Sequence, residues 1–242
     1  MAIVNLVKPK IKTFVFGTEP IKTLSMKIPN KSFGDVFVKS DITQPEMKIL
    51  ETGVFGPNGN SLGYEEFMIK PNNEIEGLYI TTKNEFKNRG GRIGELLRLT
   101  SIIEFLENQK NKFSIYSKET AIMFHSKYKF EPEIFQFIQR DKMLKTILKN
   151  NDCKDEKIIE RATQIAEKIK SKTTSEEEHR NLCRETSVLA KDYIDYLIKN
   201  VEDPKSCQFE YGIDMVLTKE KVLENKDFFN ELFKKHGIDY TI

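Results

Sequence analysis

The sequence predicts an α/β fold of the α+β kind, and three observations support this class. Residues 1–82 consist mainly of short apolar and β-branched runs between turn residues, which is typical of strands. From Arg92 the apolar residues recur at spacings of three and four, the period of a buried helix. Residues 140–203 then carry two more amphipathic helical patterns. We therefore expect one domain, residues 1–242, with strands first and most helices later.

The composition limits the possible classes of protein. The chain has 242 residues, of which 38% are hydrophobic and 31% charged, as in a globular protein. No apolar run approaches the roughly 20 residues of a membrane-spanning helix, and the N-terminus lacks a signal-peptide pattern. We therefore expect a cytoplasmic protein with no membrane partner. The formal net charge of +2 predicts no specific nucleic-acid partner.

Cysteine and histidine are sparse and scattered. Cys153, Cys183 and Cys207 are widely spaced, without a CxxC pair. An odd count with this spacing argues against a disulfide framework and against a zinc site. The three histidines of the sequence do not cluster, so we expect no metal.

The predicted elements of the first half follow from local patterns. The N-terminal strand region, residues 1–46, contains "IKTFVFG" and "IKTLSMKI". Turn formers in "GPNGNS" separate two strand-like runs, which indicates a hairpin. A third strand follows, then the helix, then a short strand. The predicted ranges are strands at 47–55, 62–69, 74–82 and 112–117, with the helix beginning near Arg92.

The second half alternates short and long elements. We expect a short helix at 118–128, with Ala121, Phe124 and Tyr128 along one face, and a strand at 131–139. The apolar spacing within residues 140–203 predicts two antiparallel helices joined by "SKTTS". A Ser175/Glu178 capping box marks the start of the second helix. This hairpin is expected to pack on the parent domain as an insertion, with a substrate lid or a dimer surface as alternatives. A strand at 206–218 and a helix at 219–235 complete the prediction.

The segment "NRGGRIG", residues 88–94, joins a strand to a helix. Unpaired N–H groups and the helix dipole at such a junction favour a phosphate, and Lys87, Arg89 and Arg92 add positive charge. The alternative is that Gly90 and Gly91 only make a tight turn before a core helix. The segment matches neither a Walker A loop nor a dinucleotide-binding fingerprint.

Two motifs resemble the GNAT acetyltransferase superfamily over roughly residues 47–139. "RGGRIG" is similar to the loop that binds the acetyl-CoA pyrophosphate, and "AIMFHSKYKF" to the helix that follows the next strand. The sequence departs from that pattern at Arg92 and Lys129, where the family has glycine, and at His125, where it usually has tyrosine. The resemblance implies a mixed, mostly antiparallel sheet flanked by helices, with an inserted helical hairpin.

The resemblance also implies site residues. The backbone near the pantetheine would come from the strand, and the pyrophosphate would contact the loop. These cofactor-binding residues are Leu78, Tyr79, Ile80, Thr81, Arg89, Gly90, Gly91, Arg92, Ile93 and Gly94.

Three catalytic residues are expected by the same resemblance. His125 would protonate the leaving thiolate, with Tyr128 as a substitute donor. Glu76 would be the base, with Glu65 and Glu66 as competitors. Each has a simpler explanation, namely an ordinary helix histidine and ordinary strand carboxylates.

The implied function is an acyl-CoA-dependent N-acyltransferase that moves acetyl, or a longer acyl group, from CoA to an amine. The acceptor would be a small molecule or a protein amine, and a homodimer is compatible with the sequence. One alternative is a catalytically degenerate GNAT-fold module that senses CoA or binds a protein. Another is a phosphate-binding α/β protein outside this superfamily.

Overall fold

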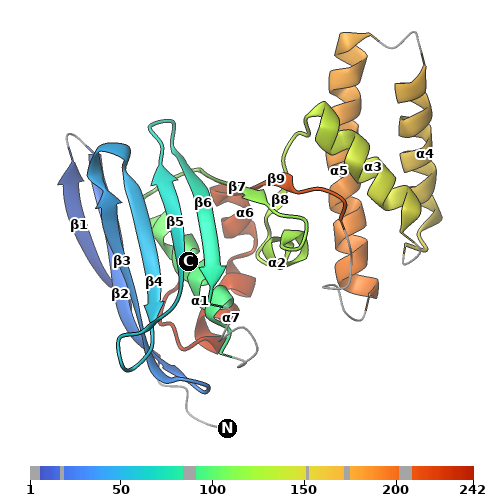
Figure 1. Cartoon of the computed structure of the whole chain (residues 1–242). Helices are drawn as coiled ribbons and strands as arrows, with labels where there is room; N and C mark the ends of the chain where they lie inside the picture. Colours follow the sequence, from blue (N-terminus) through green and yellow to red (C-terminus); the bar gives the residue numbers. More distant parts are fainter. Residues whose placement is uncertain (1–5, 17–18, 84–90, 151–152, 172–174, 202–208) are drawn as a thin grey trace. The chain divides into compact units, whose positions relative to one another are not determined.

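The structure is a computed structural model that describes residues 6–16, 19–83, 91–150, 153–171, 175–201 and 209–242. The chain divides into two compact units, each of which is described by itself (Figure 1). The first unit comprises residues 1–114 and 218–242, and the second comprises residues 115–217.

The first unit is built on an antiparallel sheet in which sequential strands are neighbours. Its order is β1-β2-β3-β4-β5-β6, and every one of these pairs is antiparallel. The predicted hairpin at "GPNGNS" is confirmed, because β4 and β5 pair across it. The bounds are Lys10–Phe16 (β1), Glu19–Asn30 (β2), Gly34–Gln44 (β3), Ile49–Phe55 (β4), Ser61–Ile69 (β5) and Glu74–Thr82 (β6). A short 3-10 helix, Pro45–Met47, separates β3 from β4.

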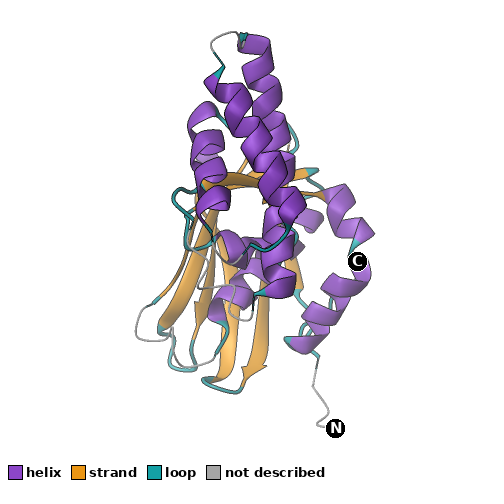
Figure 2. Ribbon diagram, turned by 90° about the vertical axis from the view of Figure 1, so that its right-hand side faces the viewer, coloured by secondary structure: helices purple, strands orange, loops and turns teal. Residues whose placement is uncertain are grey.

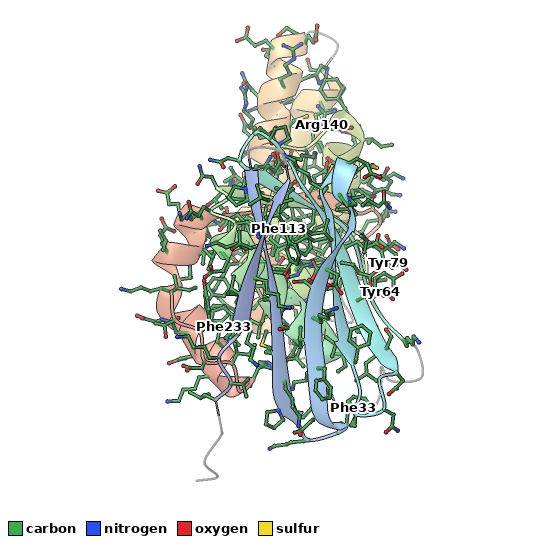
Figure 3. All side chains as sticks on the ribbon, turned by 90° about the vertical axis from the view of Figure 1, so that its left-hand side faces the viewer. Phe33, Tyr64, Tyr79, Phe113, Arg140 and Phe233 are labelled. Carbon is green, nitrogen blue, oxygen red and sulfur yellow. The ribbon has the colours of Figure 1, made fainter. Side chains whose placement is uncertain are left out.

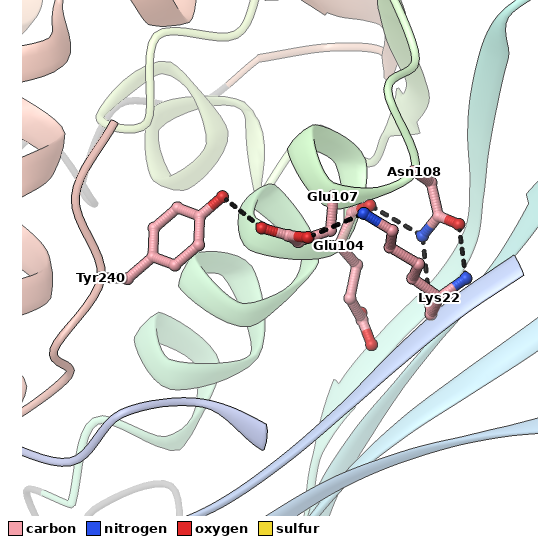
Figure 4. A network of polar contacts seen from close by, with 5 residues as sticks. All are labelled: Lys22, Glu104, Glu107, Asn108 and Tyr240. Carbon is pink, nitrogen blue, oxygen red and sulfur yellow. Dashed lines mark hydrogen bonds and ion pairs between the residues drawn. The ribbon is translucent and has the colours of Figure 1, made fainter. Parts of the chain in front are cut away.

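Helix α1, Ile93–Glu107, packs against β2, β4, β5 and β6. Figure 2 distinguishes the helices, in purple, from the strands, in orange. Its apolar residues occupy almost the whole circumference, so that most of the helix is buried. At its C-terminal end the Lys22 ammonium lies 3.2 Å from Glu107, and the Lys22 N–H donates to the Asn108 side chain at 2.8 Å (Figure 4). The Tyr240 hydroxyl donates to Glu107 at 3.1 Å. These contacts tie α1 to β2 and to the C-terminal segment.

The chain ends in two helices of the first unit, α6 (Lys219–Glu224) and α7 (Lys226–Lys235). We expected one helix over 219–235. Asn225 interrupts it, because this residue ends α6 and begins α7 with a non-helical ψ of 26°. The prediction of one continuous helix was therefore wrong at this residue.

Strand β7, Lys112–Ser117, leads from the first unit into the second, and β9, Ile213–Thr218, leads back. Between them lie β8, Glu131–Pro132, which pairs with β9 in antiparallel fashion, and, in the described part of this stretch, four helices. Helices α3, α4 and α5 pack on one another. The helix bounds are Ile122–Ser126 (α2), Phe137–Lys149 (α3), Glu156–Lys170 (α4) and Glu176–Asn200 (α5).

The predicted bounds of the second unit differ from the observed elements in several places. The expected strand at 131–139 is a strand only at Glu131–Pro132, because Gln136 and Gln139 form a reciprocal capping box that starts α3. The two helices expected in residues 140–203 are present as α4 and α5, and α3, which ends at Lys149, is an additional helix. The strand expected at 206–218 begins at Ile213, residues 209–212 are not part of it, and residues 206–208 lie outside the described residues.

The short helix also differs from its prediction. It covers Ile122–Ser126 instead of 118–128, and its buried residues are Ile122, Met123 and His125 rather than Ala121 and Phe124. A helix of little more than one turn has no complete apolar stripe, so neighbouring contacts decide which side chains are buried.

The predicted fold class is confirmed: the chain is a mixed α/β protein whose sheet is mostly antiparallel and flanked by helices. The Ser175/Glu178 capping box at the start of α5 is also confirmed. Within the described ranges, no helix is long and apolar enough to cross a membrane. The single-domain organisation, with 140–203 as an insertion, stays a prediction.

Candidate functional site

The predicted pantetheine strand, β6, carries a bulge at Leu78. Glu66 of β5 pairs with Tyr79 and Phe67 pairs with Gly77, so Leu78 has no opposite residue on β5. A bulge interrupts the ladder and redirects the strand, and bulges are over-represented next to active sites. Leu78 and Tyr79 are exposed. The ladder between β5 and β6 is therefore interrupted at one of the predicted cofactor-binding residues.

The bulge also changes which β6 side chains face α1. Before it, Ile75 pairs with Ile69 and is buried; after it, Ile80 pairs with the buried Glu65. Glu76 and Tyr79 consequently share the opposite face of the sheet, although they are three residues apart.

Two of the predicted loop residues, Arg89 and Gly90, lie outside the described residues, as does Lys87. Gly91 is described and buried. Its carbonyl accepts a hydrogen bond from the Asn30 side chain at 2.8 Å, and a Cβ at Gly91 would lie 2.1 Å from the Phe33 ring. Gly91 is not among the residues with positive φ. The reason for glycine here is close packing against Phe33, not a left-handed backbone.

The next residue, Arg92, does adopt the left-handed conformation, with φ 51° and ψ 38°. Glycine adopts this conformation without strain. Arg92 is the N-cap of α1 and its side chain caps no N–H group. The first N–H groups of a helix have no intrahelical acceptor, so they and the helix dipole can hold an anion. Arg92 itself is exposed, with its Nε 3.7 Å from Glu95.

Glu95 brings a negative charge to the same helix end. It accepts a hydrogen bond from His236 at 3.1 Å, and this contact is the largest cause that lowers the pKa of Glu95. The charges of His236 and Arg92 lower it further. Glu95 is thus held by His236 and Arg92 at the start of α1.

The predicted base, Glu76, forms an ion pair with Lys70 at 2.6 Å and is partly exposed. Its competitor Glu66 lies on the same sheet face, opposite Glu51 and Tyr79 on the flanking strands. Burial, then the charges of Glu66 and Asp41, raises the pKa of Glu51. This face therefore carries three neighbouring carboxylates on β3, β4 and β5.

Two tyrosines lie beside these carboxylates. The rings of Tyr64 and Tyr79 are 5.7 Å apart between centroids, on neighbouring strands (Figure 3). Desolvation is the largest cause that raises the pKa of Tyr64, followed by Tyr79 and by the carboxylates Glu66 and Glu51.

The other competitor, Glu65, lies in the core beneath the sheet. Its carboxylate is 2.8 Å from the Arg98 guanidinium, and both side chains are 1% exposed. Burial raises the pKa of Glu65 to about 7, although Arg98 and Ser101 lower it. Arg98 also lies over the Phe113 ring, 5.4 Å from its centroid.

A second buried carboxyl, Glu104, faces the same layer. It accepts a hydrogen bond from Thr52 at 2.8 Å. Burial raises the pKa of Glu104 to about 8, and the charge of Glu65 adds to the rise. Thr52 lies opposite both Ser40 and Glu65 in the sheet. These polar residues of three neighbouring strands face the polar residues Arg98 and Glu104 of α1.

The predicted acid, His125, belongs to the second unit. It is buried, in edge contact with the Phe124 ring at 5.1 Å and the Phe130 ring at 6.0 Å between centroids. Tyr128 is buried too, and its N–H donates to the His125 carbonyl at 2.9 Å. The predicted acid residues and the described cofactor residues thus lie on different units.

Sequence reasoning missed Asn30, Phe33, Arg98 and Glu104. A signal was available for the last two. Apolar residues flank Arg98 and Glu104 on both sides in the middle of α1, and a charge buried there needs a polar partner. Asn30 and Phe33 gave no signal, because they are 61 and 58 positions from Gly91 and only the fold brings them to it.

Comparisons with known proteins find similarity in structure only. No family model matches the chain, and no curated protein matches it either. A protein described as an acyl-CoA N-acyltransferase from Klebsiella pneumoniae is similar over 39% of this chain and 66% of its own, with 12% identity and a TM-score of 0.35. PaiA N-acetyltransferase from Thermoplasma acidophilum, solved with coenzyme A, is similar over 39% of this chain and 58% of its own, with 23% identity and a TM-score of 0.33.

A GNAT-family N-acetyltransferase from Escherichia coli, solved in complex with CoA, matches at 14% identity over 34% of this chain and 46% of its own, with a TM-score of 0.29. The chain covers less than two thirds of each of these three solved structures. This likeness concerns the fold of part of the chain and does not extend to activity.

Proposed function

We propose that this chain is a GNAT-like N-acyltransferase that transfers an acyl group, most simply acetyl, from acyl-CoA to an amine. The observation that carries the proposal is the β6–α1 unit: a strand bulged at Leu78 that precedes, in the chain, a helix whose N-cap side chain caps no N–H group. The motifs "RGGRIG" and "AIMFHSKYKF" support the same assignment.

The described residues fit an acyl-CoA. The bulged strand interrupts the β5–β6 ladder where a pantetheine would lie alongside β6. The N-terminus of α1, with Arg92 exposed beside it, suits a pyrophosphate. When bound, acyl-CoA would supply a thioester as the acyl donor.

Acyl transfer forms a C–N bond and breaks the C–S bond, so the amine loses a proton and the sulfur gains one. Glu76 or Glu66, on the face opposite α1, would accept the amine proton. His125 would donate the proton to the sulfur. Tyr128, buried beside it, would be the substitute donor.

CoA binding can be tested at Arg92 with a matched control. We expect Arg92→Glu to weaken CoA binding in calorimetry by about tenfold or more, because it replaces a cation beside the pyrophosphate. Lys48→Glu is the control, since Lys48 also has a left-handed backbone, with φ 52°, in the same unit. Equal CoA affinity of both variants and the parent would show that CoA does not bind at α1.

Turnover is tested separately with acetyl-CoA and a panel of amines. We expect His125→Ala to lower kcat by about tenfold or more with unchanged CoA affinity, because a general acid typically contributes 10²–10⁴-fold. His125→Tyr, which restores the usual family residue, should retain more activity than Ala. Parent-like turnover of a folded His125→Ala protein would exclude His125 as the acid.

A second function, CoA binding without turnover, is favoured by one observation. His125 is buried and in edge contact with two phenylalanine rings, as a structural histidine would be. CoA binding together with no thioester consumption across the amine panel would support this second function instead.

A further inference from the structure

We propose that two copies of this chain pair through β1, antiparallel and about a twofold axis at Thr13. The proposal concerns an interaction surface and does not depend on the acyltransferase function. The partner is a second copy, and the observations concern the free edge of β1, its exposed side chains and their self-complementary order.

Strand β1 is an edge strand of the sheet. It stands at one end of the strand order and, among the strands that the structure describes, pairs only with β2, from Lys10 opposite Ser25 to Phe16 opposite Glu19 (Figure 1). In an antiparallel ladder, every second residue directs its N–H and C=O groups to the other edge. An exposed edge of this length can pair with another strand unless it is blocked.

The side chains of β1 leave apolar surface uncovered. Val15 is 71% exposed, Phe14 is 41% exposed and Ile11 is 37% exposed. Ile11, Thr13 and Val15 share one face of the strand because side chains alternate. Burying such residues against a second strand would remove apolar surface from water, at about 25 cal/mol per Å².

The order of residues makes this edge self-complementary. A twofold axis at Thr13 places Ile11 opposite the partner's Val15 and Lys12 opposite the partner's Phe14. All seven residues of the strand then pair. An axis one residue earlier would place Lys12 directly opposite the partner's Lys12, which is unfavourable.

The same pairing of lysine with phenylalanine already occurs inside this sheet. Lys27 of β2 lies opposite Phe37 of β3 in the antiparallel register, with its ammonium 5.6 Å from the ring centroid. The Lys12 pairs across the axis would repeat this cation–π geometry. The lysines of β1 are therefore compatible with self-pairing. Pairing of β1 with an apolar strand that has no aromatic residue opposite these lysines would be unfavourable.

Charge at the axis provides the decisive test. Sedimentation equilibrium should show a concentration-dependent dimer for the parent chain. Thr13→Lys and Thr13→Glu should each raise the dissociation constant by about tenfold or more, because like charges lie directly opposite at the axis. An equimolar mixture of the two variants should restore the dimer as a heterodimer.

The control is Thr43→Lys, which places the same charge on an exposed residue. This residue belongs to β3, a strand that pairs with β2 on one side and β4 on the other. It should dimerise like the parent, and circular dichroism should show that all variants fold. A parent chain that stays monomeric at high protein concentration overturns the proposal. A dimer that Thr13→Lys leaves intact overturns it as well.

A disulfide gives an independent check of the register. In a Cys207→Ser background, the remaining cysteines Cys153 and Cys183 are buried. Thr13→Cys should then form an intermolecular disulfide under mild oxidation, and Lys10→Cys, three residues from the axis, should not. Equal cross-linking at both positions would rule out an axis at Thr13.

Discussion

The buried pair Glu65–Arg98 predicts that its two partners are not equivalent. When Glu65 is replaced by leucine, the Arg98 guanidinium loses its carboxylate inside the core. Arginine does not deprotonate in proteins, so it has no neutral form to adopt. Removing one partner of a buried pair typically costs about 3–5 kcal/mol. We expect Glu65→Leu to lower the free energy of unfolding by this amount at pH 9, where Glu65 is ionised, and by about 1.4 kcal/mol more at pH 6, because the raised folded pKa of Glu65 makes the parent more stable there.

Arg98→Met should behave differently because a carboxyl can take up a proton. The pKa of Glu65 is about 7 with Arg98 present, against 4.5 in the unfolded chain. At pH 6 Glu65 is therefore mostly neutral already, and removing the guanidinium costs little beyond its contacts with Phe113 and Ser101. Without Arg98 the pKa rises further, so Glu65 stays neutral where the parent ionises.

The pH dependence follows from this difference. A group with a raised folded pKa binds its proton more tightly in the folded state, so its contribution is lost as pH rises. Above pH 7 the Arg98→Met variant should lose up to about 1.4 kcal/mol per pH unit relative to the parent. Urea unfolding followed by circular dichroism measures both variants at pH 6, 7, 8 and 9. Equal destabilisation by the two substitutions, independent of pH, would refute this account of the pair.

Three further predictions concern single positions. Glu104, with a pKa of about 8, favours folding at low pH and loses this contribution as pH rises from 5 to 8; Glu104→Gln should therefore show a flatter dependence of the urea midpoint on pH than the parent. Ser175→Ala should lower the free energy of unfolding by about 1 kcal/mol, since Ser175 accepts from the Glu178 N–H at 3.2 Å; an unchanged urea midpoint would contradict this. Gly91→Ala should cost about 1–3 kcal/mol by overpacking against Phe33, and it should cost much less in a Phe33→Ala background; a cost that persists there would exclude Phe33 as the cause.

Local sequence was sufficient for several elements. The turn formers of "GPNGNS" predicted the β4–β5 hairpin, because such residues adopt the turn conformations that antiparallel neighbours need. The apolar spacing from Ile93 to Leu106 predicted α1, because a helix buried on all sides requires apolar residues all around. The Ser175/Glu178 capping box marked the start of α5. Each of these signals lies within a single helix or in the turn between two consecutive strands.

The tertiary structure decided what depends on residues far apart in the chain. The sequence does not show that Gly91 packs on Phe33, or that Leu78 is the extra residue of β6, because the pairing partner on β5 sets the register. It also left Glu65 and Glu66 equivalent. Only the alternation of β5 against α1 assigns Glu65 to the core beside Arg98 and Glu66 to the opposite face. The physical reason is that strand register and burial are properties of contacts between elements, which no single element carries in its own sequence.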